Sequence, residues 1–136
     1  MTTDMPTVPD ALRDLIDRPL LVMLGTTLPN NTPQVTPVWF YEEGGYFYFN
    51  TAVGRLKDKA IRANPYVSLL VMDPDNGFRY LQVRGPVVEF LEGEAGRAGI
   101  NRLAGRYTGN PIYSFGPPEE LRVHYKVKPE HILAFG

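Results

Sequence analysis

The chain has 136 residues, of which 43% are hydrophobic and 21% are charged, a composition typical of a globular protein with one core. Its 14 cations and 15 anions give a net charge of −1, so no overall positive field exists to attract nucleic acid or an anionic membrane. Cysteine is absent, which excludes disulfides, thiol nucleophiles and zinc–thiolate sites and agrees with a reducing compartment.

The start of the chain, residues 1–9, is polar with two prolines, and we expect it to be flexible. It lacks the basic start and apolar centre of a signal peptide. No apolar run approaches the ~20 residues that a membrane-spanning helix needs. We therefore expect a cytoplasmic protein with no membrane partner.

The first half of the chain predicts strands joined by short turns. In chain order, the pattern indicates a short helix at 11–17, a strand at 20–26, a turn at 29–33, an aromatic strand at 34–41 and, after the Gly44–Gly45 hairpin, a strand at 46–51. Within these strands, Phe47 and Phe49 are expected to pack in the core.

The second half predicts a helix, two strands, a weaker helix and a strand-rich end. The pattern indicates a helix at 53–63 that ends before Pro65, a strand at 66–72, a turn at 73–77 and a strand at 78–90 that bends at Gly85–Pro86. It then indicates a partly helical segment at 92–107 weakened by glycines, a loop at 108–118 and one or two strands at 121–135.

These elements predict a mainly β (α+β) fold in one domain, residues 1–136. Six strands, with glycines and bulges where a sheet must curl, favour a small closed or half-closed barrel with short flanking helices. The helices are too few for alternating βαβ units.

Basic side chains at the start of the predicted helix 53–63 are the clearest functional signal. Arg55 and Lys57 fall in its first turn, where unpaired N–H groups already carry a partial positive charge. Cations there are unfavourable unless an anion lies among them, so the pattern favours a phosphate or carboxylate site. The alternative is a solvated basic face, because Arg55, Lys59 and Arg62 share helical spacing.

Two further observations bear on a site. Pro37 cannot donate a ladder hydrogen bond and belongs at a sheet edge or a bulge, which would leave backbone groups of Thr36 and Val38 free. Trp39 and Tyr41 share one face of their strand and would pack near a bound ring, across a dimer interface or in the core.

No nucleophile–base pair, dinucleotide fingerprint or phosphate loop is present in the sequence. His124 and His131 fall on opposite faces of a regular strand and are expected to be ordinary, partly exposed side chains rather than metal ligands. If the protein is an enzyme, its reactive group must come from a cofactor, and no side chain is assigned a catalytic role.

Several segments together resemble the pyridoxamine 5'-phosphate oxidase-like superfamily. They are 32–40 (TPQVTPVWF), 54–57 (GRLK), 62–69 (RANPYVSL) and 102–109 (RLAGRYTG) with Tyr113. Within this superfamily the chain is most similar to flavin/deazaflavin oxidoreductases of the F420-dependent branch. The similarity spans residues 20–113.

The resemblance implies a six-stranded split β-barrel that forms a homodimer, with a flavin-type cofactor in a groove at the interface. Arg55 and Lys57 would bind the cofactor's anionic groups, Thr51 and Ala52 would add a hydroxyl and backbone N–H groups, and Thr36, Pro37, Val38 and Trp39 would adjoin the ring. Tyr107 and Tyr113 would either line the substrate mouth or fix their segment to the barrel.

The implied activity is hydride transfer from the deazaflavin F420 to a small conjugated acceptor such as a quinone, an enone, a tetrapyrrole or a nitroaromatic. Flavin mononucleotide (FMN) is the alternative cofactor. A carrier or sensor that binds flavin or haem without catalysis is the alternative function.

Overall fold

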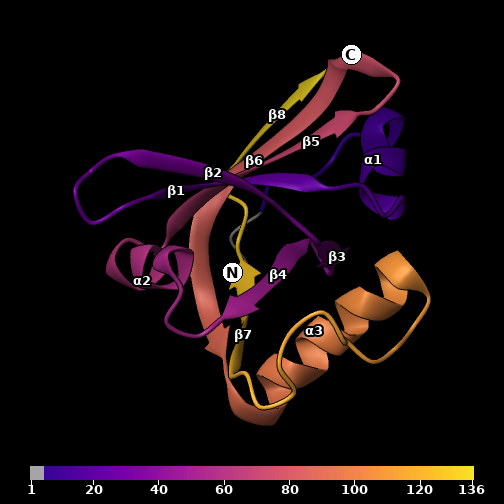
Figure 1. The fold of residues 1–136 in the computed structure, drawn as a ribbon. Coiled ribbons are helices and arrows are strands. Elements are labelled where there is room, and N and C mark those ends of the chain that lie inside the picture. Colours follow the sequence, from indigo (N-terminus) through magenta and orange to yellow (C-terminus); the bar gives the residue numbers. More distant parts are fainter. Residues whose placement is uncertain (1–4) are drawn as a thin grey trace.

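A computed structural model describes residues 5–136 of the chain (Figure 1). The helical elements are a 3₁₀ turn (Asp10–Leu12), α1 (Arg13–Asp17), α2 (Leu56–Ala63) and α3 (Gly93–Thr108). The strands are β1 (Val22–Thr27), β2 (Pro33–Val38), β3 (Tyr41–Glu43), β4 (Tyr46–Ala52), β5 (Tyr66–Asp73), β6 (Asn76–Leu91), β7 (Arg122–Val127) and β8 (His131–Phe135). The expected flexibility of residues 1–4 lies outside the described residues, whereas Val8 packs against the core.

The strands form one curled antiparallel sheet in the order β2-β1-β5-β6-β7-β4-β3, with β8 added to β6. The sheet stays open between β2 and β3, which are neighbours along the chain but are not paired within the described residues. The mainly β fold with short helices is confirmed. Pro37 lies in β2, which is an edge strand as the missing N–H required.

The number of strands is eight among the described residues, and the prediction of six was wrong. The predicted strand at 34–41 divides at Trp39–Phe40, where the chain leaves the β2 edge and enters β3 on the other side of the opening. The predicted segment at 121–135 forms two strands, β7 and β8, which pair with different parts of β6.

Strand β6 is 16 residues long and joins the two parts of the sheet. Its first part pairs with β5 and β8, from Tyr80 to Pro86, and its second part pairs with β7, from Val87 to Leu91. The predicted bend at Gly85–Pro86 falls at this change of partner. A Cβ at Gly85 would overlap the backbone carbonyl of Lys128, so the close approach of β6 to the connection between β7 and β8 requires glycine.

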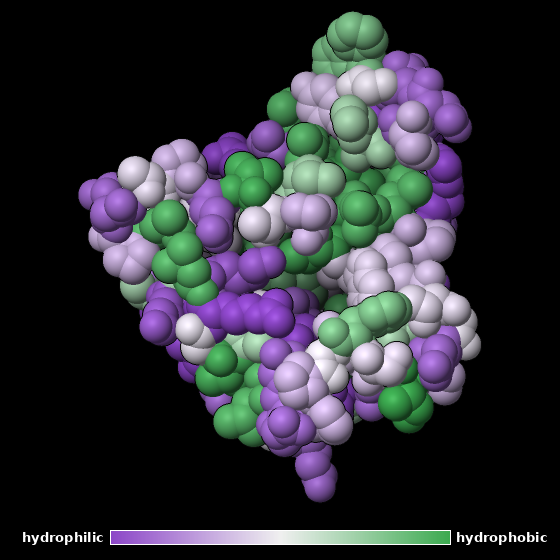
Figure 2. Space-filling view, viewed as in Figure 1, coloured by the Kyte–Doolittle hydropathy of each residue, from purple (hydrophilic) through white to green (hydrophobic). Residues whose placement is uncertain are grey.

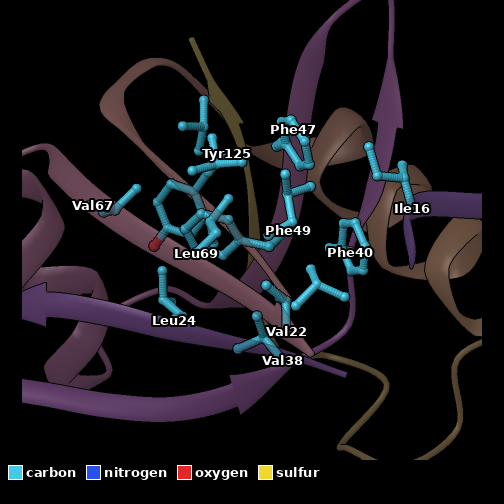
Figure 3. Close-up of a cluster of buried hydrophobic side chains, with 14 of the residues drawn as sticks. Ile16, Val22, Leu24, Val38, Phe40, Phe47, Phe49, Val67, Leu69 and Tyr125 are labelled. Carbon is cyan, nitrogen blue, oxygen red and sulfur yellow. The ribbon is translucent and has the colours of Figure 1, made fainter. Parts of the chain in front are cut away.

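The core lies inside the curl of the sheet (Figure 3). It contains Phe47 and Phe49 from β4, at 1% and 0% exposure, which confirms that both aromatics are core residues. Phe49 stacks on Tyr125 of β7, with ring centroids 4.7 Å apart. Alternating residues of β1, β5 and β6 complete the core.

Both longer helices differ from their predicted form. Helix α2 begins at Leu56 rather than at Val53, and Arg55 is its N-cap. Helix α3 is continuous over 16 residues, so the expectation of a helix only in part was wrong. Two of its glycines are required by packing: a Cβ at Gly96 would overlap the carbonyl of Arg122, and one at Gly99 would overlap the ring of His124. The helix therefore lies closer to β7 than an alanine-bearing helix could.

Among residues 5–136, none of the helices is both long enough and apolar enough to span a membrane.

Candidate functional site

A groove of about 280 Å³ lies at the opening of the sheet, between the end of β2, the end of β4, the start of α2, one side of α3 and the loop that follows α3. Figure 2 shows it as a hollow in the middle of this face, with hydrophilic side chains toward α2 and hydrophobic surface above it. The lining residues are Leu21, Pro37, Val38, Trp39, Asn50, Thr51, Arg55, Lys57, Ile100, Leu103, Tyr113, Phe115 and Arg122.

Six of the eight site residues suggested by the sequence line this groove: Pro37, Val38, Trp39, Thr51, Arg55 and Lys57. The fold brings them together because β2 ends at the opening of the sheet and β4 leads into α2. Thr36 is not among the lining residues and lies opposite the buried Leu24 of β1. Ala52 is also outside the lining and is 4% exposed.

One end of the groove is cationic. Arg55, Lys57 and Arg122 line it, and Glu120 lies between two of them. Lys57 forms no ion pair with any of the described residues. Burial lowers the pKa of the Lys57 ammonium, and the nearby charges of Arg55 and Arg122 lower it further. This end of the groove therefore holds more positive charge than the protein itself neutralises.

Arg122 is a site residue that the sequence analysis missed. Its side chain is 4% exposed, its Nε donates to Asn50 Oδ1 at 2.9 Å, and its Nη1 donates to Glu120 at 2.7 Å. It lies on β7, 67 residues after Arg55, and no local motif marks it. Asn50 was missed for the same reason, because a lone amide in an aromatic strand has no diagnostic spacing.

Asp58 fixes the start of α2, which carries Arg55 and Lys57. Its carboxylate accepts hydrogen bonds from the Gly54 N–H at 2.8 Å, the Tyr125 hydroxyl at 2.6 Å and Arg62 Nε at 2.9 Å. Burial alone would raise the pKa of Asp58, but these hydrogen bonds hold it below its ordinary value. Asp58 is therefore a buried anchor of the helix.

His124 is buried rather than partly exposed, so the expectation for this residue was wrong. It is 3% exposed because α3 covers it through Gly99. Asn50 Nδ2 lies 3.1 Å from His124 Nδ1, and the Tyr41 hydroxyl lies 2.9 Å from Nε2. Burial, and then the charge of Arg102, lowers the pKa of His124 to about 4. The ring is therefore neutral and links the groove to the buried side of β3.

The tautomer of His124, that is, which ring nitrogen carries the proton, follows from its hydrogen-bond partners. Because Asn50 Oδ1 accepts from Arg122 Nε, its amide group Nδ2 faces the histidine and donates to Nδ1. Nε2 then carries the proton and donates to the Tyr41 oxygen. Asn50 Nδ2 also donates to the Gly96 carbonyl at 3.0 Å. This chain of hydrogen bonds fixes Asn50 and, through it, one side of the Arg122 guanidinium.

The other end of the groove is aromatic. Trp39 stacks on Tyr107 at 5.2 Å, and Tyr113 and Phe115 meet Trp39 edge-on at 6.2 and 6.1 Å. The Tyr107 hydroxyl donates to the Leu20 carbonyl at 2.5 Å and accepts from the Phe40 N–H at 3.1 Å. Tyr107 therefore fixes α3 to the barrel, whereas Tyr113 lines the groove.

No cluster of three or more potential metal ligands occurs in the described part of the chain. The groove thus combines a cationic end, built from two arginines and a lysine, with an apolar and aromatic end. The chemistry of the first end suits an anionic group, and that of the second suits a planar ring.

Known proteins resemble this chain over nearly its whole length. The sequence model of the family described as pyridoxamine 5'-phosphate oxidase matches residues 8–135. A solved F420 reductase is 36% identical, with a TM-score of 0.81, and the match covers 93% of this chain and 98% of the reductase. No curated protein matches the chain significantly.

More distant structures share the fold alone. A conserved hypothetical protein from Mycobacterium tuberculosis is 20% identical with a TM-score of 0.75, over 98% of this chain and 88% of that protein. General stress protein 26 from Bacillus anthracis is 19% identical with a TM-score of 0.63, over 91% and 90% of the two chains.

Proposed function

Because this chain belongs to the pyridoxamine 5'-phosphate oxidase family, a family of flavin-binding oxidoreductases, we propose that it is an oxidoreductase that uses the deazaflavin F420. The observation that carries this proposal is the two-ended groove, with three cations at one end and aromatic side chains at the other. The likeness to an F420 reductase at 36% identity supports the choice of cofactor.

The residues of the groove fit such a cofactor. Arg55, Lys57 and Arg122 would hold its anionic groups, and the Thr51 hydroxyl lies beside them. The apolar end, with Pro37 and Trp39, would accommodate the ring. When bound, the deazaflavin supplies the hydride, while the side chains of the protein bind and orient it and exclude water. No titratable side chain is needed to form a covalent bond.

The amount of positive charge favours F420 over FMN, the alternative cofactor. F420 carries a phosphate and a polyglutamate tail, whereas FMN has a single phosphate. Three cations against Glu120 exceed what one phosphate requires. A carrier or sensor that binds flavin or haem without turnover is the alternative function, and the absence of hydride transfer from a bound, reduced cofactor would favour it.

We further propose that the protein works as a homodimer with the groove beside the interface. In the part of the sheet formed by β1, β2, β5, β6 and β8, the outer face carries exposed apolar side chains. Cross-strand pairing places on this face Met23, Val35, Met72, Leu133 and Phe135, which are 37–64% exposed. Pro37 belongs to the same face and also lines the groove, so a second copy on this face would border the cofactor.

The small-molecule acceptor remains a class rather than a compound. Apolar walls formed by Ile100, Leu103 and Phe115 favour a conjugated organic molecule, and none of the lining residues is acidic. The absence of cysteine supports a cytoplasmic location for this reaction.

Trp39 provides a direct test, because it is the only tryptophan of the chain and it lines the groove. Purified protein is titrated separately with F420 and with FMN at several salt concentrations, and the fluorescence of Trp39 is followed. We expect tighter binding of F420, with an affinity that falls as the salt concentration rises. Tighter binding of FMN at every salt concentration would mean that the cofactor is FMN rather than F420.

Catalysis is tested with reduced F420, the protein and a panel of small quinones and enones, by following the absorbance of the cofactor. We expect oxidation of the cofactor with a conjugated acceptor and slow oxidation by oxygen alone. Binding without turnover of any acceptor would favour the carrier or sensor function. Failure of both cofactors to bind would overturn the proposed function.

A further inference from the structure

The guanidinium of Arg122 is held on one side and left with free donors on the other. Nε is fixed by Asn50 at 2.9 Å, and the ring of Tyr113 lies 5.0 Å from the guanidinium carbon. Nη2 makes no hydrogen bond with the residues that the structure describes, although the side chain is only 4% exposed. A buried guanidinium with unused N–H groups in the wall of a groove is a preformed site for an anion.

A carboxylate of the protein partly fills this site. One oxygen of Glu120 accepts from Arg122 Nη1 at 2.7 Å, and the other lies 3.4 Å from Arg55 Nη2. Glu120 thus bridges two of the three cations that line the groove. A carboxylate in this position makes the contacts that a phosphate oxygen would make, because both present paired acceptors to a guanidinium.

The backbone of Glu120 is held independently of its carboxylate. Arg97 Nη2 donates to the Glu120 carbonyl at 2.6 Å, and the Glu120 N–H donates to the Pro117 carbonyl at 3.0 Å. The side chain is part of a connecting segment between α3 and β7, not of a helix or strand. Rotation of this side chain alone would therefore release Arg122 and Arg55 without rearranging the loop.

We propose that Arg122 is the inner cation of an anion-binding site, and that Glu120 occupies this site until an anionic group of the ligand displaces its carboxylate. The inference rests on the proposed function, because it concerns the same groove. Glu120 offsets part of the positive charge of the cationic end while the groove is empty. It also sets a threshold, because only an anion that binds the two arginines better than a carboxylate does will displace it.

The test uses Glu120→Gln, which keeps the shape of the side chain and removes its charge. Glu119→Gln is the matched control, because Glu119 is the adjacent, exposed glutamate of the same loop. Inorganic phosphate is titrated into each full-length protein and followed by the arginine Nε resonances, and F420 and FMN are titrated by Trp39 fluorescence. Thermal unfolding of each variant is measured in parallel.

We expect Glu120→Gln to bind phosphate and F420 about tenfold more tightly than wild type, since the anion no longer competes with a charged hydrogen bond. Glu119→Gln should bind as wild type does. The Arg122 Nε resonance should move on addition of phosphate, which a purely structural arginine would not show. Arg122→Lys, which keeps the charge but loses the contact with Asn50, should weaken binding.

Two negative results are distinguishable. If wild type binds the cofactor but Glu120→Gln binds it no more tightly, the displacement model is overturned and the proposed function stands. An equal gain in Glu119→Gln would also overturn it, because the effect would then come from net charge alone. If neither wild type nor any variant binds phosphate, F420 or FMN, the proposed function itself fails.

Discussion

Arg55 and Lys57 approach the groove from one short stretch of backbone, yet their surroundings differ. The Arg55 side chain is 55% exposed and meets Glu120, whereas Lys57 is partly buried between Arg55 and Arg122 without a carboxylate of its own among the described residues. Lys57 is therefore held in a position that is unfavourable for the empty protein. Such positions are retained for a ligand rather than for stability.

Replacing either cation should weaken cofactor binding and leave folding almost unchanged. We expect Arg55→Ala and Lys57→Ala each to cost ~1.5–3 kcal/mol of binding free energy, the range for hydrogen bonds to charged groups. Trp39 fluorescence measures the affinity and thermal unfolding measures stability. Lys59→Ala, which removes an exposed cation of the same helix, is the control and should bind normally. Normal binding by both groove variants, or a large loss of stability, would make these residues structural.

His124 predicts a loss of stability in mild acid. An unfolded histidine gains a proton near pH 6.5, whereas the folded protein protonates His124 only near pH 4. Because the unfolded state binds the proton first, the free energy of unfolding falls as the pH drops from 6.5 to 4. The shift corresponds to about 3 kcal/mol over this range.

Denaturant unfolding of wild type and His124→Gln across pH 4–7 measures this contribution. The wild type should lose about 3 kcal/mol more than the variant as the pH falls. His131→Gln, at an exposed histidine of β8, should keep the wild-type dependence. Parallel curves for wild type and His124→Gln would show that the ring is not buried as described.

At the scale of elements, local patterns predicted most strands because alternating burial is written into the sequence. The hairpin at Gly44–Gly45 and the bend at Gly85–Pro86 were also predictable, since each depends on neighbouring residues. Helix α3 was underestimated because glycine weakens an isolated helix, and only the fold reveals that Gly96 and Gly99 permit its contact with β7.

The candidate site was also predictable only in part. Arg55, Lys57 and Trp39 belong to segments with recognisable patterns, and all three line the groove. Arg122 and Asn50 reach the groove only because β4 and β7 pair, with Asn50 opposite His124. The burial of His124 likewise depends on α3, which covers β7. The residue pattern of a single strand does not predict this contact.

Replacing two different glycines of α3 by alanine should change the free energy of unfolding in opposite directions. Gly99→Ala should lower the free energy of unfolding by ~1–3 kcal/mol, because the added methyl group overlaps the His124 ring and forces the helix from β7. Gly105→Ala should raise it by up to about 1 kcal/mol, since the nearest atom to its Cβ is 3.7 Å away and alanine favours a helix. Denaturant unfolding compares the two, and an equal effect of both would exclude close packing as the reason for the glycines.

At the scale of the whole molecule, the apolar outer face of the sheet predicts self-association. Val35 is 64% exposed on edge strand β2, so Val35→Glu should leave the core intact and convert a dimer to a monomer with weaker cofactor binding. Sedimentation at micromolar concentration measures this. Ile112→Glu, at a 62% exposed residue of the loop after α3, is the control and should remain dimeric. A monomeric wild type that binds its cofactor tightly would contradict the model of a groove beside an interface.

The length of β6 has a consequence for how the molecule unfolds. One uninterrupted strand supplies hydrogen-bond partners to β5 and β8 in one part of the sheet and to β7 in the other. Neither part of the sheet can unfold while β6 stays fully paired, so the barrel has no boundary at which one part would unfold alone. In native-state hydrogen exchange, the central amides of β5 and of β7 should therefore show the same opening free energy and open as one cooperative unit.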